Sequence, residues 1–132
     1  MEAIFLLTDT DINSLPLKII SMIDNNVFQG KLSGSYKFTW SRKLTSTAGK
    51  CKPIIHNGKK CGIIKLSSHL CNTFQRILET IAHEICHLAA WIFDNYKGHG
   101  KIWKTYVLRV SKRFPELSSI SRCHTYRKIA NN

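Results

Sequence analysis

The chain has 132 residues, of which 43% are hydrophobic and 21% charged, and this composition suits one globular domain spanning 1–132. No stretch reaches the roughly 18 uncharged apolar residues that a membrane span needs, and the N-terminus lacks the basic region of a secretion signal. Five cysteines without a CxxC pair favour reduced thiols inside the cell over a disulfide framework.

The positive charge is unevenly distributed along the chain. The formal net charge is +12, yet residues 1–35 hold two lysines against four acidic residues, so the remainder carries +14. This asymmetry favours a polyanionic partner, most simply nucleic acid. A basic surface that only aids solubility is the alternative.

The first predicted helix lies within DINSLPLKIISMIDNNVF, residues 11–28. Apolar residues recur at helical spacing from Leu15 onward. Ser14 is a plausible N-cap, and Pro16 is tolerated in the first turn of a helix.

Three strands are expected next. YKFTWS (36–41) alternates aromatic and polar residues, as a half-buried strand does. KLTSTAGKCK (43–52) and CGIIKLS (61–67) predict two more strands, joined by a loop with the turn signal Asn57-Gly58. The expected sheet is small, three-stranded and antiparallel.

Two helices follow the sheet. The first is expected from Asn72 to about Asn95, before a break at two glycines, and the second covers KIWKTYVLRVSKRF (101–114). The basic tail is expected to form a last strand with a frayed end. The predicted fold class is therefore α+β, with an N-terminal helix, the sheet, and a helical pair.

The motif HEICH, residues 83–87, is the main chemical signal. His83 and His87 stand at i and i+4 on a helix that is apolar on most sides, so both imidazoles can reach one point in space. Glu84 flanks that point. Burying these groups without partners would cost several kcal/mol in total, and a divalent metal removes that penalty.

A third ligand is needed because catalytic zinc takes three protein ligands and keeps one position open. His99 is the predicted third ligand, since Gly98 and Gly100 let the chain turn back toward the motif. Asp94 is a weaker alternative. Glu84 is then the predicted catalytic residue, a general base for peptide hydrolysis assisted by Zn²⁺.

Beyond this motif, six stretches resemble the SprT-like metalloprotease family, above all its germ-cell nuclear acidic protein branch, with Spartan more distant. They are VFQGKL (27–32), WSRKLTSTAGKC (40–51), IIKLSSHL (63–70), RILETIAHEICHLAAWIFD (76–94), GHGKIWK (98–104) and FPELSSISRCHTY (114–126). The resemblance covers most of the chain from Val27 onward, in family order.

The resemblance implies a nuclear zinc protease that acts on proteins bound or crosslinked to DNA and is switched on by DNA. It also implies that His83, His87 and His99 bind zinc and that Glu84 is catalytic, in agreement with the spacing. Members of this branch commonly continue into a zinc ribbon with paired CxxC motifs. The sequence has none, so the ribbon is expected to be absent and DNA contact to come from the domain itself.

An aromatic and basic cluster is the predicted site for single-stranded or distorted DNA, because bases stack on aromatic rings while cations track phosphates. Its members are Trp40, Arg42, Lys43, Lys50, Lys52, Lys59 and Lys60. The alternative is that Trp40 belongs to the core and the lysines are merely solvated. A second basic cluster near the C-terminus could also contact DNA, and the alternative is that it is a solvated helix face and tail. Its members are Arg109, Lys112, Arg113, Arg122, Arg127 and Lys128.

The sequence therefore predicts a monomeric, DNA-stimulated zinc endopeptidase that degrades DNA-bound or DNA-crosslinked proteins. Two alternatives stay open. One is a zinc peptidase whose activity does not depend on nucleic acid. The other is a catalytically weak DNA-binding module in which zinc is mainly structural.

Overall fold

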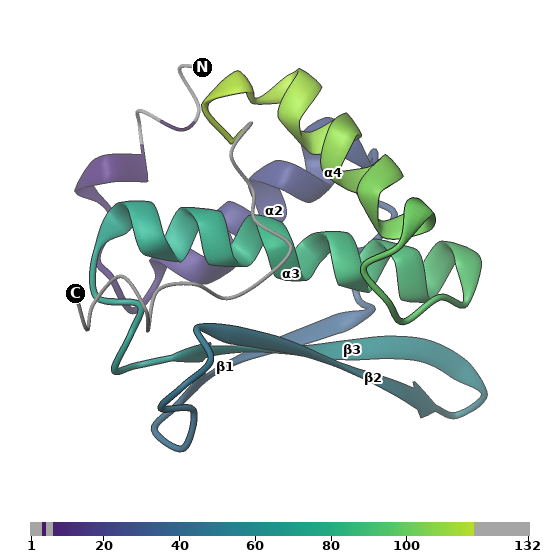
Figure 1. Cartoon of the computed structure of the whole chain (residues 1–132), viewed down its shortest axis with the longest axis horizontal. Coiled ribbons are helices and arrows are strands. Elements are labelled where there is room, and N and C mark those ends of the chain that lie inside the picture. Colours follow the sequence, from purple (N-terminus) through teal and green to yellow (C-terminus); the bar gives the residue numbers. More distant parts are fainter. Residues whose placement is uncertain (1–3, 5–6, 118–132) are drawn as a thin grey trace.

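The structure is a computed structural model that describes residue 4 and residues 7–117. Figure 1 shows the helices gathered on one side of a three-stranded sheet, with the longest helix lying along it. The elements are η1 (Leu7–Asp9), α2 (Leu15–Val27), β1 (Tyr36–Ser41), β2 (Gly49–His56), β3 (Lys59–Ser67), α3 (Phe74–Asp94), α4 (Lys101–Arg113) and η2 (Pro115–Leu117). The predicted α+β class is confirmed, and the strand predicted for the tail lies outside the described residues. Within those residues, no helix is both long and apolar enough to cross a bilayer.

The sheet is mixed, so the prediction of an antiparallel sheet is wrong. Its strand order is β1-β3-β2, with β1 parallel to β3 and β2 antiparallel to β3. Pro53 explains this order, because a proline has no N–H to donate and is confined to an edge strand. With β2 at the edge, the Asn57-Gly58 turn folds β3 into the central position between β2 and β1. Both turn residues have positive φ, 52° and 78°, as the turn signal predicts.

Helix α2 begins after Ser14 with Pro16 in its first turn, as predicted. Ser14 itself has helical dihedral angles, φ −94° and ψ −15°, and its side chain makes no capping bond. The proline, whose fixed φ suits a first turn, therefore marks this start better than the serine. Near the other end, the buried Asp24 carboxylate accepts the backbone N–H of Leu32 at 3.0 Å and holds the turn toward β1.

Helix α3 is the centre of the core and carries the HEICH motif. Thr73 caps it by accepting the N–H of Arg76 at 3.2 Å, and Asn95 ends it in the left-handed conformation at φ 55°. The helix packs directly on the sheet. A Cβ on Gly62 of β3 would lie only 2.4 Å from Leu88 Cδ1, so any larger residue there would force the buried Leu88 side chain to move.

Candidate metal centre

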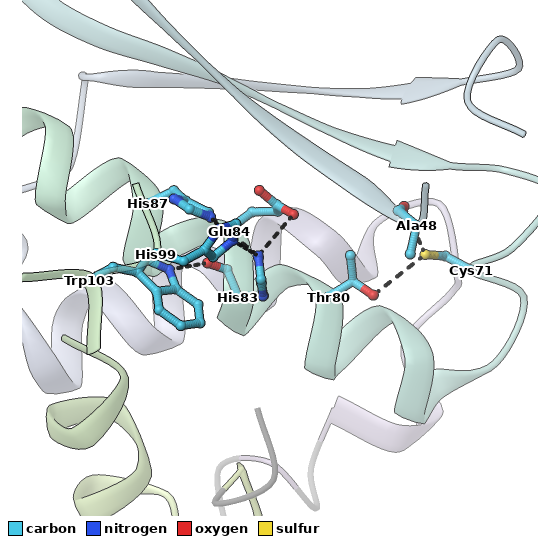
Figure 2. Close-up of polar contacts among 8 residues, drawn as sticks. All are labelled: Ala48, Cys71, Thr80, His83, Glu84, His87, His99 and Trp103. Carbon is cyan, nitrogen blue, oxygen red and sulfur yellow. Dashed lines mark hydrogen bonds and ion pairs between the residues drawn. The ribbon is translucent and has the colours of Figure 1, made fainter. Parts of the chain in front are cut away.

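His83 and His87 lie about one turn apart on α3, and their side chains converge. Their Nε2 atoms lie 3.2 Å apart, and His83 is only 3% exposed while His87 is half-buried. The helical spacing of the motif places both rings on the same side of α3, as expected. Figure 2 shows the two imidazoles converging beside the sheet.

His99 reaches the same point from the turn between α3 and α4. Its Nε2 lies 2.9 Å from His87 Nε2 and 3.1 Å from His83 Nε2. Tyr96 organises this turn, because its hydroxyl oxygen accepts the backbone N–H of Gly100 at 2.7 Å. A Cβ on Gly98 or Gly100 would lie 2.7 Å or 2.3 Å from that oxygen. The two glycines are therefore needed to make room for the tyrosine.

The three histidines fit a divalent metal. Zinc bound tetrahedrally to imidazole nitrogens at about 2.0–2.1 Å requires the nitrogens to be roughly 3.3 Å apart, close to the observed separations. His83, His87 and His99 are the group within the described residues that could hold a metal ion. Asp94, the weaker alternative, is exposed, and its Oδ2 atom accepts a hydrogen bond from the Tyr106 hydroxyl group.

Glu84 lies beside the histidines and points toward the sheet, as Figure 2 shows. It is 1% exposed, and its Oε2 atom lies 4.0 Å from His83 Nε2, which is beyond hydrogen-bond distance. Burial raises the pKa of Glu84 to about 8. Burial, and to a lesser degree the nearby charge of Glu84, also raises the pKa of the Cys51 and Cys86 thiols. These thiols are therefore neutral neighbours of the carboxyl group.

Trp103 on α4 forms one wall of the centre. Its ring centroid lies 4.9, 5.4 and 4.8 Å from the rings of His83, His87 and His99 respectively. The indole is 2% exposed, and its Nε1 donates to the backbone oxygen of His83 at 3.4 Å. Trp103 thus restricts the orientation of all three imidazoles. An aromatic residue at helical spacing usually serves general packing, so the sequence pattern did not indicate this contact.

The model of the SprT-like family matches residues 17–124, which is more than half of the chain. The chain belongs to the SprT-like family.

Three relatives show how this SprT-like chain compares with longer proteins. It is 34% identical over 114 residues to the germ cell nuclear acidic protein of Drosophila melanogaster, covering 86% of the chain and 11% of that protein. The human germ cell nuclear acidic protein is 29% identical over 119 residues, covering 87% of the chain and 17% of that protein. An HMG box-containing protein of Schizosaccharomyces pombe is 33% identical over 120 residues, covering 81% and 33%. The chain thus spans between about one tenth and one third of these relatives.

A small hollow lies beside His87, between α3 and the edge strand β2 of the SprT-like fold. Cys51 and Pro53 line it from β2, and Trp91 and Tyr96 line it from α3 and the following turn. Trp91 Nε1 donates to the backbone oxygen of Cys61 at 2.8 Å, which ties this end of α3 to the sheet. The metal centre therefore lies next to a strand edge.

The structure does not bring the predicted DNA-binding residues together in one cluster. Trp40 and Arg42 line a hollow of about 350 Å³ at the end of β1, and Lys43 is exposed in the following loop. Lys60 lies on the helix side of the sheet, with its Nζ 5.5 Å from the centre of the Trp91 ring. The remaining lysines, Lys50, Lys52 and Lys59, lie on the opposite face of the sheet.

The second predicted basic cluster divides in a similar way. Arg109 donates from Nη2 to the backbone oxygen of Val27 at 2.8 Å, and Arg113 donates from Nη2 to Asn26 Oδ1 at 2.8 Å. Both arginines therefore join α4 to the end of α2. Lys112 is exposed, and Arg122, Arg127 and Lys128 lie outside the described residues.

Proposed function

We propose that this SprT-like chain is a zinc-dependent endopeptidase. The observation that carries the proposal is the convergence of three imidazole Nε2 atoms with a buried carboxyl group beside them. Structural zinc sites usually close with four ligands, mostly cysteine, whereas catalytic sites use three protein ligands. The cluster also opens toward solvent, because His99 is exposed while His83 is buried.

His83, His87 and His99 would hold the metal, and Trp103 would keep their rings in place. When bound, zinc would supply the positive charge that polarises the scissile carbonyl and acidifies an attacking water molecule. The packing of Trp103 against the three imidazoles matters because hydrolysis requires the reacting groups to be held in a fixed geometry.

Glu84 would act as the proton carrier. Its carboxylate would take the proton from the attacking water and pass it to the leaving amine of the cut peptide bond. Burial favours the protonated form of Glu84 in the metal-free protein, and the positive charge of a bound zinc ion would favour the carboxylate that takes the proton.

The edge strand β2 would receive the substrate. A peptide in extended conformation can add to an exposed sheet edge through backbone hydrogen bonds, which requires little of its side chains. Strand β2 is an edge strand and lines the hollow beside His87 through Cys51 and Pro53. This placement supports a shallow cleft with little sequence selectivity.

The proposed substrates are DNA-bound or DNA-crosslinked proteins, with DNA as the stimulating partner and the nucleus as the location. The net charge of +12 supports a polyanionic partner. The names of the fly and human relatives describe nuclear proteins, which supports the location. We propose that the chain acts as a monomer and that this domain itself contacts DNA.

Cleavage of a histone with and without single-stranded DNA tests this function. The zinc-loaded wild type is compared with Glu84→Gln and with Glu79→Gln, a matched change on the same helix. We expect DNA-dependent cleavage by the wild type and by Glu79→Gln, and a loss of about 10²–10⁴-fold in Glu84→Gln with zinc retained.

The other outcomes separate the alternatives. Cleavage that is indifferent to DNA and salt would indicate a zinc peptidase without nucleic-acid dependence. A zinc-loaded wild type that binds DNA but cuts nothing would indicate a binding module. Full activity in Glu84→Gln would contradict the assignment of the proton carrier.

A further inference from the structure

The face of the sheet that points away from the helices is lined by lysines. Gly49 and Gly62 mark the helix side, because a Cβ on them would lie 2.5 Å from Thr80 Cγ2 and 2.4 Å from Leu88 Cδ1. Side chains alternate along strands, so the residues next to these glycines face the other way. Lys59 projects there beside the hairpin turn, and four further lysines form what we call the lysine face: Lys37 from β1, Lys50 and Lys52 from β2, and Lys65 from β3.

The strand register places these charges side by side. Lys50 lies directly opposite Lys65 in the antiparallel pair, and Lys37 and Lys52 flank Ile63 on its two sides. Directly opposed like charges destabilise a sheet. Lys37, Lys50 and Lys52 are exposed, and Lys65 is half-buried.

No acidic side chain offsets this charge from the surrounding sequence. Residues 25–78, which include the whole sheet, contain no aspartate or glutamate. The same stretch holds ten basic residues: Lys31, Lys37, Arg42, Lys43, Lys50, Lys52, Lys59, Lys60, Lys65 and Arg76. A repulsive array of this kind costs stability in the free protein, and a polyanion would relieve that cost.

We propose that the lysine face binds the phosphodiester backbone of single-stranded DNA. The proposal rests on the DNA-dependent part of the proposed function and assigns its contact surface. Two features favour a single strand. Ile54 and Ile63 lie among the lysines as half-buried apolar side chains, which unpaired bases can contact. In a duplex the bases are stacked inside, and a flat face would meet only sugar and phosphate.

This location keeps DNA out of the metal centre. Helix α3, which carries His83 and His87, covers one face of the sheet (Figure 1), whereas the lysine face is on the other side. The edge strand β2 contributes to both, through Cys51 and Pro53 on one side and through Lys50 and Lys52 on the other. A protein attached to bound DNA would thus reach the histidines around the edge of β2.

The test measures binding of a labelled, mixed-sequence single strand by the zinc-loaded full chain across a range of salt concentrations. The variant Lys50→Gln/Lys65→Gln removes the opposed pair. The control Lys18→Gln/Lys104→Gln removes two exposed lysines from the helices and has the same charge change. Thermal unfolding is recorded for each protein, and a duplex of the same sequence is the comparison ligand.

We expect the slope of log affinity against log salt to fall by about 1.4 in the sheet variant, or about 0.7 per lysine. The affinity ratio of wild type to variant then grows roughly 25-fold when salt is lowered from about 1 M to about 0.1 M. Thermal stability should stay equal or rise, because a repulsive pair is removed. The control should keep the wild-type slope, and the duplex should bind more weakly.

An unchanged slope in the sheet variant, or an equal loss in the control, would overturn the lysine face while leaving DNA stimulation intact. If the duplex bound as tightly as the single strand, and its binding depended equally on Lys50 and Lys65, the choice of a single strand would be overturned. A wild type that binds no DNA at any salt would overturn both this inference and the DNA-dependent part of the proposed function.

Discussion

His99 owes its position to Tyr96 as well as to the backbone turn that carries it. The tyrosine hydroxyl accepts the N–H of Gly100, and its ring fills the space that side chains at residues 98 and 100 would occupy. Groups that orient metal ligands from behind commonly change metal affinity by about 10–100-fold. Tyr96 is therefore a positioning residue of the metal centre.

Replacing Tyr96 with phenylalanine should loosen this turn. We expect zinc affinity, measured by competition with a chelating dye, to fall about tenfold because Gly100 loses its acceptor. The free energy of unfolding of the metal-free protein should fall by only about 1 kcal/mol. Tyr36→Phe, on β1, is the control and should change neither quantity. If Tyr96→Phe bound zinc as tightly as the wild type, the positioning role of Tyr96 would be contradicted.

At the residue scale the sequence predicted that the three histidines come together, but not which side chains pack around them. The i, i+4 spacing placed His83 and His87, and the glycines flanking His99 indicated a turn. Neither pattern could show that Trp103 would contact all three rings, because an aromatic residue at helical spacing usually serves general packing. That contact depends on how α4 packs against α3.

The contact between β2 and α3 is the packing that matters most at the scale of elements. A Cβ on Gly49 would lie 2.5 Å from Thr80 Cγ2, 3.2 Å from Leu66 Cδ2 and 3.2 Å from the backbone oxygen of Lys65. Thr80 precedes Glu84 by one helical turn on α3. The space at Gly49 therefore sets how closely the edge strand approaches the part of α3 that carries Glu84.

Gly49→Ala should overpack this contact. We expect a loss of about 1–3 kcal/mol in the free energy of unfolding, measured by urea denaturation. Thr80→Ser removes the clashing methyl group, so adding it to Gly49→Ala should recover part of the loss, with a coupling of at least about 0.5 kcal/mol. Additive effects of the two substitutions would show that the strand and helix separate without strain.

Element types were predictable, but strand pairing was not. Hydrophobic periodicity and the Asn57-Gly58 signal gave three strands and a hairpin. The second strand was predicted at 43–52, whereas β2 runs from Gly49 to His56. The loop before β2 alternates in polarity much as a strand does, so the pattern could not show where the strand begins. Pro53 was the available signal for an edge strand, and it implies that β3 lies in the centre of the sheet.

At the scale of the whole molecule, metal binding and folding should be linked. The three ligands come from α3 and from the turn before α4, so a bound ion joins the two elements. Zinc at about 100 times its dissociation constant would add about 2.7 kcal/mol of stability.

Zinc removal should therefore lower the melting temperature by about 10 °C, as measured by thermal unfolding with and without a chelator. Adding zinc back should restore it. His99→Ala should melt at the same temperature with and without zinc. A melting temperature that does not respond to zinc in the wild type would contradict the link between metal and fold.

The charge asymmetry of the chain predicted a polyanionic partner but not the surface that would contact it. Lys50 and Lys52 were included in the predicted DNA cluster, whereas Lys37 and Lys65 were not. Their common face becomes apparent only through the register that aligns Lys37 with Ile63 and Lys50 with Lys65. Pairing between strands distant in sequence sets that register, and local patterns do not contain it.

X-ray absorption at the zinc edge, recorded on the purified wild type, tests the central claim most directly. The account predicts about one zinc per chain, surrounded only by nitrogen and oxygen atoms at about 2.0–2.1 Å, with imidazole signals. A sulfur shell at about 2.3 Å would indicate cysteine ligation, and with it a site other than the three histidines. That result, or a protein that retains no zinc, would contradict the metal centre on which the proposed function depends.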